Sequence, residues 1–227
     1  MVKLFIMREY NDCIIAGAAP TDIDIMPMGA ALTIAADGGA DLLRECGILP
    51  DIVIGDMDSI KDGSFSPKTE MLEYPPEKDD TDTLLAAKTG IERGCNRFFM
   101  YGCSGRRLDH TIANIQTLKY IAKENCEGYM IGDSENITVI RNSSIRLNVR
   151  PGTGVSVFAI GKDAKGVSLS GLKYEIRDAV INDSFPIGVS NEATEAHPDI
   201  SVSDGSLIIL WRCPFIVPEI RRPDSED

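Results

Sequence analysis

The sequence predicts an α/β domain with a doubly wound, mostly parallel sheet, followed by a small all-β sandwich of jelly-roll type. Short apolar runs without alternation indicate strands covered on both faces, and helical segments lie between several of them, as in βαβ units. From about residue 143 the runs become short and β-branched, which is typical of a sandwich. We therefore expect an α/β domain over 1–142, a β domain over 143–217 and a flexible tail over 218–227.

Five apolar runs predict the strands of the first domain. They read CIIAGA (13–18), ALTIAAD (31–37), DIVIGD (51–56), RFFMYG (97–102) and YMIGD (129–133). Their continuous hydrophobicity favours a parallel sheet, in which ligands bind at the carboxyl ends of the strands.

Three segments, 39–47, 79–94 and 108–125, predict helices. The second begins at Thr81 or Asp82 as N-cap and ends at Gly94. The residues expected to face its core are Leu84, Ala87 and Ile91. The third helix carries the clearest apolar stripe, formed by Leu108, Ile112, Ile115, Leu118 and Ala122.

Six runs predict the strands of the second domain, with Gly, Asp, Ser and Pro between them. They read SIRLNV (144–149), GVSVFAI (154–160), GVSLSG (166–171), YEIRDA (174–179), ISVSD (200–204) and SLIILW (206–211).

The composition limits the classes of partner. Thirty-five acidic and 23 basic residues give a formal charge of −12, which argues against nucleic acid or an anionic membrane as the main partner. A nucleotide is still compatible with this charge, because a metal ion neutralises phosphate locally. The six cysteines are scattered without the spacing of a zinc site, and no apolar run approaches the ~18 residues of a membrane span. We expect a cytoplasmic protein with reduced thiols.

Charged residues gather where the predicted strands end. They are Asp37 after the second run, Asp56 and Asp58 after the third, and Arg106, Arg107 and Asp109 after the fourth. The carboxyl ends of parallel strands share one edge of a sheet, so we expect these side chains to converge. The segment EKDDTD (77–82) opens a helix and adds acidic residues to the same edge.

Asp56 and Asp58 repel each other unless a cation or hydrogen-bond donors stabilise them. Mg²⁺ prefers carboxylate oxygens, phosphates and water, so the pair is a candidate magnesium site; solvated aspartates in a turn are the alternative. Asp79, Asp80 and Asp82 are either acids that favour the first turn of a helix or further groups near the same metal. Two carboxylate clusters on one edge favour a shared metal.

The segment GCSGRRLDH (102–110) has two glycines that let a ligand approach the backbone and two arginines suited to phosphate. The alternative makes Asp109 an N-cap and leaves the arginines in solvent. Neither a P-loop nor a dinucleotide fingerprint is present. These residues indicate Mg²⁺-dependent chemistry on a polyphosphate and leave the second substrate open. A glycosyltransferase with a D-x-D motif and a non-catalytic cation-binding protein remain alternatives.

Four ordered motifs resemble those of the thiamine pyrophosphokinase family: AADGGADLL (35–43), PDIVIGDMDS (50–59), EKDDTDTLLA (77–86) and GCSGRRLDHTIANI (102–115). The later GVSNEATEA (188–196) is similar to the family's segment in the β domain. The resemblance implies Mg²⁺-dependent transfer of the pyrophosphoryl group of ATP to the hydroxyl of thiamine, giving thiamine diphosphate and AMP. It also implies a homodimer with substrate sites between the α/β domain of one subunit and the β domain of the other.

The resemblance further implies roles for single residues. The metal ligands would be Asp56, Asp58, Asp79 and Asp82, and the groups that bind ATP and its phosphates would be Asp37, Lys78, Arg106 and Arg107. Asp109, Ser190 and Asn191 would bind thiamine. The catalytic set would be Asp56, Asp58, Asp82 and Asp109. The chain departs from the family at Leu84, where many relatives carry an acid, and at Cys103 and Ser104, where relatives often have glycine.

Overall fold

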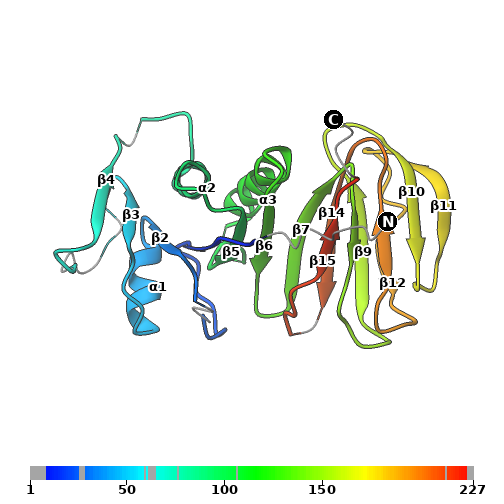
Figure 1. Cartoon of the computed structure of the whole chain (residues 1–227), viewed down its shortest axis with the longest axis horizontal. Helices are drawn as coiled ribbons and strands as arrows, with labels where there is room; N and C mark the ends of the chain where they lie inside the picture. Colours follow the sequence, from blue (N-terminus) through cyan, green and yellow to red (C-terminus); the bar gives the residue numbers. More distant parts are fainter. Residues whose placement is uncertain are drawn as a thin grey trace, which may run out of the picture.

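Figure 1 shows the computed structural model, which describes residues 9–25, 29–58, 60, 65–75, 77–105, 107–212 and 214–223. One ten-stranded sheet runs through both halves in the order β12-β9-β14-β7-β6-β5-β1-β2-β3-β4. A second sheet of five strands has the order β11-β10-β13-β8-β15. Its apolar residues share a core with one face of the large sheet, so the two sheets form a sandwich at the right of the view.

The parallel half of the large sheet has strands β1 (Asp12–Ala16), β2 (Leu32–Ala36), β3 (Ile52–Gly55), β4 (Glu70–Glu73), β5 (Arg97–Tyr101) and β6 (Glu127–Ile131). Its helices are α1 (Gly39–Glu45), α2 (Asp82–Glu92) and α3 (Leu108–Lys123). The five strands and three helices predicted here are confirmed. The sequence does not predict β4, because this edge strand reads EMLE and only Leu72 is partly buried.

The antiparallel half continues the same sheet with β7 (Glu135–Arg141), β9 (Gly154–Ala159), β12 (Asn191–Glu192) and β14 (Ser206–Arg212). The second sheet consists of β8 (Ser144–Arg146), β10 (Ala164–Ser170), β11 (Ile176–Ile181), β13 (Asp199–Ser201) and β15 (Glu219–Arg221). β7 pairs antiparallel with both β6 and β14. The hydrogen-bonded sheet therefore extends across residue 142, where we expect the first domain to end.

Burial on both faces explains the continuous apolar runs of the parallel strands. In β1, Ile14 and Ala16 face the core shared with α1 and the second sheet, whereas Cys13 and Ile15 face α2 and α3. β9 differs, since buried residues alternate there with partly exposed ones. β1 and β9 thus show the patterns of a doubly covered and a singly covered strand.

Close packing decides which face of α2 is buried. The buried residues are Ala86, Ala87, Thr89 and Gly90, while Leu84 and Ile91 keep partial exposure. A Cβ added at Gly90 would lie 2.6 Å from the ring of Phe98, so the helix approaches the sheet through small side chains. The prediction that Leu84 faces the core was therefore wrong in part, because α2 packs its small side chains against the sheet.

The predicted stripe of α3 is also buried only in part. Leu118 and Ala122 lie in the core, but Leu108 and Ile112 expose 76% and 52% of their surface. The first half of the helix buries Asn114 instead, whose Nδ2 donates to the carbonyl of Cys103 at 2.7 Å. This bond turns a polar side chain toward the sheet and leaves two apolar ones in solvent.

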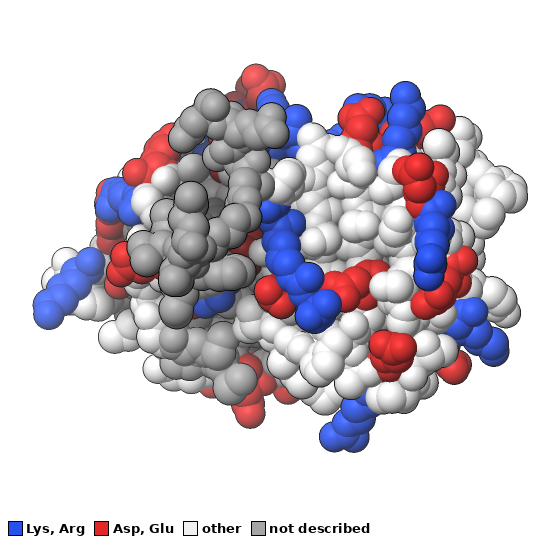
Figure 2. Space-filling model, turned by 45° about the vertical axis from the view of Figure 1, so that its right-hand side comes forward, with Lys and Arg blue, Asp and Glu red and all other residues white. Residues whose placement is uncertain are grey.

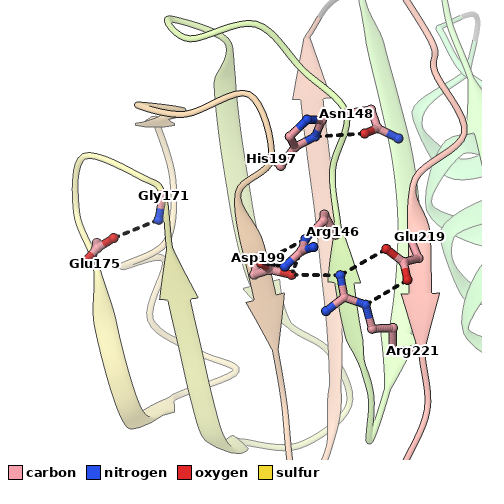
Figure 3. Close-up of polar contacts among 8 residues, drawn as sticks. All are labelled: Arg146, Asn148, Gly171, Glu175, His197, Asp199, Glu219 and Arg221. Atoms are coloured by element: carbon pink, nitrogen blue, oxygen red, sulfur yellow. Dashed lines mark hydrogen bonds and ion pairs between the residues drawn. The ribbon is translucent and has the colours of Figure 1, made fainter.

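Part of the segment expected as a flexible tail is a strand. β15 pairs with β8, and an ion-pair network joins both to β13 (Figure 3). Arg146 Nη2 lies 2.7 Å from Asp199 Oδ2, and Arg221 Nη2 lies 3.6 Å from Asp199 Oδ1. The charges near the C-terminus thus find partners on neighbouring strands. Residues 224–227 lie outside the described part of the chain.

Charged side chains of both signs are interspersed on the face shown in Figure 2. The described residues on that face give a polyanion no concentrated positive charge to bind. Among the residues that the structure describes, no helix has the length and hydropathy needed to cross a membrane.

Candidate active site

Three aspartates meet at the carboxyl ends of β2 and β3. Asp37 follows β2, and Asp56 and Asp58 follow β3; one carboxylate oxygen from each lies within 4.8 Å of the others. The backbone turns sharply here, with φ of 48° at Asp37 and 64° at Met57. Non-glycine residues adopt this left-handed conformation at a cost, and such strain concentrates at functional sites. The predicted convergence of these three residues is confirmed.

The donor set of this cluster fits a hard divalent cation. Asp37 Oδ1 is buried and has no hydrogen-bond partner, so its desolvation is uncompensated by the described residues. Asp56 Oδ1 accepts one hydrogen bond, from the backbone N–H of Asp58 at 3.2 Å. Carboxylate oxygens are the ligands that Mg²⁺ prefers, and a cation would offset the mutual repulsion of the three groups. Asp37, assigned to phosphate by the resemblance, is thus a candidate ligand.

The acidic segment before α2 is arranged differently. Thr81 is the N-cap, and its Oγ1 accepts from the N–H of Leu84 at 3.2 Å. Lys78 Nζ approaches Asp82 Oδ1 at 2.6 Å as an ion pair without hydrogen-bond geometry, and Lys88 Nζ binds Asp80 Oδ2 at 2.5 Å. Asp82 therefore has a lysine, rather than the other aspartates, as its nearest charge.

Asp79 and Asp82 both lie outside the cluster of three aspartates. Asp82 still lines a cavity of about 260 Å³ together with Asp37, Asp56 and Lys78, whereas Asp79 is exposed. Their assignment as metal ligands stays a prediction. The position of Lys78 in this cavity is consistent with phosphate binding.

The glycine loop after β5 lies against the loop after β1. A Cβ added at Gly17 would lie 2.6 Å from the carbonyl oxygen of Gly102, so neither loop has room for a side chain at that contact. Cys103 is buried, which raises the pKa of its thiol to about 12 and keeps it neutral. The buried side of the glycine loop is therefore uncharged at Cys103. Arg106 lies outside the described residues.

Arg107 and Asp109 form an exposed pair at the start of α3. Arg107 Nε and Nη2 donate to Asp109 Oδ1 and Oδ2 at 3.1 and 2.5 Å. The guanidinium lowers the pKa of Asp109, which is therefore a carboxylate at neutral pH. Arg107, not Asp109, occupies the N-cap position. Both side chains are 63% exposed, so the guanidinium is accessible to a phosphate.

A second cavity of about 310 Å³ adjoins the first, and both are lined by Asp37, Thr83, His110 and Asn114. Asn114 is the residue that pattern reading missed, because one polar position in an amphipathic helix carries no signal by itself. Its amide fixes the carbonyl of Cys103 and hence the course of the glycine loop. Arg107 also lines this second cavity, so the arginine, the loop and Asp37 surround one space.

Ser190 and Asn191 lie at the opposite edge of the large sheet. Asn191 begins β12; its Oδ1 accepts from Tyr174 N at 3.0 Å, and its Nδ2 donates to Tyr174 O at 2.9 Å. Ser190 has φ of 59°, and its N–H donates to Ser156 Oγ at 3.1 Å. Both line a separate cavity of about 770 Å³. The order of the sheet puts eight strand intervals, roughly 38 Å, between β12 and β3.

Comparison with known proteins agrees with this two-part arrangement. The family model described as "Thiamin pyrophosphokinase, catalytic domain" matches residues 27–130, and the one described as "Thiamin pyrophosphokinase, vitamin B1 binding domain" matches 142–207. A Bacillus subtilis protein described as thiamine pyrophosphokinase is 27% identical over 186 residues, which cover 79% of this chain and 86% of that protein.

Solved structures show the same fold. The thiamine pyrophosphokinase of Bacillus subtilis superposes with a TM-score of 0.78 at 25% identity, covering 90% of this chain and 99% of that one. The thiamin pyrophosphokinase of Candida albicans superposes with a TM-score of 0.72 at 15% identity, covering 89% of each. The two family models together span most of the chain, including the aspartate cluster and β12. The chain belongs to the thiamine pyrophosphokinase family of enzymes.

Proposed function

We propose that the chain transfers the pyrophosphoryl group of ATP to the hydroxyl of thiamine, with Mg²⁺, and releases thiamine diphosphate and AMP. The observation that carries this proposal is the aspartate cluster, in which Asp37 Oδ1 is buried without a partner beside a glycine loop and Arg107. Carboxylates for a metal and an arginine for phosphate, on one edge of a parallel sheet, suit a nucleoside triphosphate. The family membership supplies thiamine as the acceptor.

The residues divide the work of binding and orienting the substrates. Asp37, Asp56 and Asp58 would hold Mg²⁺, which when bound neutralises charge on the phosphate oxygens. Lys78 and Arg107 would bind phosphate oxygens. The thiamine oxygen forms a bond to the β-phosphorus while the bond from that phosphorus to the oxygen bridging it to the α-phosphorus breaks. The hydroxyl proton passes to a carboxylate or to water, and AMP leaves with the bridging oxygen. Asp109, a carboxylate beside Arg107, would accept a hydrogen bond from the attacking hydroxyl.

The acceptor site needs a second copy of the chain. Ser190 and Asn191 lie roughly 38 Å from β3 along the sheet, too far to hold thiamine beside the aspartates of their own subunit. Apolar side chains are exposed at both places: Phe185, Ile187 and Val189 before β12, and Leu108 and Ile112 beside the phosphate loop. A homodimer in which the segment before β12 of one subunit covers the start of α3 of the other would bury both.

Mixing variants tests the homodimer. Asp56→Asn should be inactive, and Asn191→Ala should have little activity at a thiamine concentration well below its raised KM, where the mixture is assayed. A 1:1 mixture, dissociated and reassembled, should regain about a quarter of wild-type activity, since half of the dimers then contain one intact site. No regain in a mixture that exchanges subunits, or a monomer in sedimentation, would contradict the shared site.

The reaction itself is tested by its products. Purified chain with Mg²⁺, ATP and thiamine should give AMP and thiamine diphosphate in equal amounts. ADP with thiamine monophosphate would mean transfer of a single phosphoryl group, and the absence of any thiamine-dependent product would contradict the proposal.

Nucleic acid and membranes are not among the proposed partners, and the proposed location is the cytoplasm.

A further inference from the structure

One aspartate of the acidic segment before α2 has no role in the proposed reaction. Asp80 lines the cavity of about 260 Å³ that also contains Asp37 and Asp56. Its carboxylate nevertheless lies outside the cluster of three aspartates. An aspartate side chain can change its rotamer while the backbone stays in place. Asp80 is therefore placed where a change of rotamer would bring a fourth carboxylate toward the candidate metal site.

A lysine on α2 holds this carboxylate in another direction. Lys88 Nζ donates to Asp80 Oδ2 at 2.5 Å, and the same Nζ lies 5.8 Å from the ring centroid of Tyr120 in α3. The hydrogen bond with Asp80 raises the pKa of Lys88, so the ammonium group is charged at neutral pH. Lys88 is not among the described residues that line the cavity. The ion pair therefore draws the carboxylate toward the two helices and away from Asp56.

Stability of the fold is a weak reason for this pair. The side chains of Lys88 and Asp80 are 33% and 29% exposed, and pairs with this much contact to water contribute little. The number of carboxylates near a cation has a larger consequence. Mg²⁺ requires a regular octahedral shell and retains several waters, whereas Ca²⁺ accepts more oxygen ligands in a flexible geometry. A further carboxylate at the site would therefore favour Ca²⁺ over Mg²⁺.

Resting on the proposed function, we propose that Lys88 sets the cation preference of the active site by withholding the Asp80 carboxylate from it. With the pair intact, the site offers Asp37, Asp56 and Asp58 and leaves its other positions to water and phosphate oxygens. Without the ammonium group, the nearest cation to which the Asp80 carboxylate could turn would be the metal ion. Lys88 is thus a positioning residue that acts through Asp80.

Displacement of Mn²⁺ from the full-length chain by Mg²⁺ and by Ca²⁺, followed by EPR without nucleotide, tests this role. Lys88→Met removes the ammonium group and keeps an unbranched side chain. It should bind Ca²⁺ about tenfold more tightly than wild type, with a smaller gain for Mg²⁺, so the ratio of the two affinities shifts toward Ca²⁺. Lys88→Arg keeps the charge and should have the wild-type ratio. Adding Asp80→Asn to Lys88→Met should restore that ratio, because the released carboxylate is gone.

Lys162→Met is the matched control. It removes the lysine of another exposed pair, with Asp204, whose Nζ–Oδ1 distance is also 2.5 Å, in the antiparallel half. This variant should bind both cations as wild type does.

An equal gain for Mg²⁺ and Ca²⁺ in Lys88→Met would mean that only charge at a distance has changed, and would overturn the proposal. An unchanged affinity for both would overturn it too, and a wild-type chain that binds no Mn²⁺ would refute the metal site together with it. Because binding is measured without turnover, a chain that shows the expected ratios but makes no thiamine diphosphate would refute the proposed reaction and leave the role of Lys88 standing.

Discussion

The two ends of the ten-stranded sheet hold their polar side chains in different ways. At the β2 and β3 end, Asp37, Asp56 and Asp58 follow strands that are buried on both faces, and the strained backbone points three like charges at one another. At the β9 and β12 end, the Asn191 side chain is neutral and forms hydrogen bonds with the backbone of Tyr174 and Glu192. At the first end three carboxylates repel one another. At the second end the polar side chain already has hydrogen-bond partners within the chain.

This difference follows from the two kinds of sheet. A parallel strand covered on both faces has room for polar groups only at its ends, so charged residues concentrate there. In the antiparallel half, β9 buries alternate residues and exposes the others in part, so the Oγ of Ser156, within the strand, accepts a hydrogen bond from the N–H of Ser190. We therefore expect changes at the first end to affect activity and changes at the second to affect both stability and acceptor binding.

The largest effect is expected for Asp56→Asn. Removing one carboxylate from the candidate metal site should lower activity at least about a hundredfold at saturating Mg²⁺. Without metal the variant should unfold at the same temperature as wild type or higher, since one of three repelling charges is gone. Asp183→Asn, an exposed acid in the antiparallel half, is the matched control. Full activity of Asp56→Asn would remove this residue from the metal site.

Phe215→Ala tests whether the two halves unfold together. The ring centroid of Phe215 lies 6.0 Å from the ring centroid of Phe99 in β5 and 6.2 Å from that of Trp211 in β14. Phe215 therefore contacts both halves. We expect a loss of about 2–3 kcal/mol in the free energy of unfolding, with a single transition, since the ring is partly buried. Ile216→Ala, at an exposed neighbour, should change stability by less than about 0.5 kcal/mol. Two separate transitions in wild type would show that the halves are independent.

Asn191→Ala tests the comparison at the β12 end of the sheet, where the polar side chain has hydrogen-bond partners within the chain. Three hydrogen bonds to the buried side chain are lost, which leaves the N–H and C=O of Tyr174 and the N–H of Glu192 without them and should cost about 1–2 kcal/mol of stability. If Asn191 also meets thiamine, KM for thiamine should rise while the affinity for ATP stays unchanged. Glu192→Gln, its exposed neighbour, serves as the control. A change confined to ATP binding would contradict the separation of the two ends.

The same contrast explains how much the sequence predicts. Convergence of Asp37, Asp56 and Asp58 follows from topology alone, because parallel strands end at one edge. Side-chain pairing does not: that Asp82 meets Lys78 depends on conformations that periodicity cannot specify. The exposure of Leu108 could not be predicted because an apolar stripe does not reveal where the sheet beneath the helix ends.

Continuity of the sheet across residue 142 was likewise beyond local patterns. It depends on the pairing of β7 with β14, whose residues lie more than sixty positions later in the chain. The composition changes near residue 143, whereas the antiparallel half of the sheet already begins with β7 at Glu135. Composition says nothing about which strands pair, because backbone hydrogen bonds across a sheet are independent of side-chain type.

The smallest effect concerns the charge pair at the start of α3. Arg107 lowers the pKa of Asp109 below its ordinary value of 3.8, with a smaller contribution from the backbone N–H of His110. The pairing therefore contributes fully above that ordinary pKa and is lost as pH falls through the lowered one, and its effect on stability is slight because both groups are exposed. In Arg107→Gln the pKa of Asp109 should rise, as followed by NMR of its carboxyl carbon. An unchanged pKa would mean that the helix terminus, and not Arg107, lowers the pKa of Asp109. Asp109 would then be a carboxylate independent of Arg107. It could face the acceptor hydroxyl while the arginine binds phosphate.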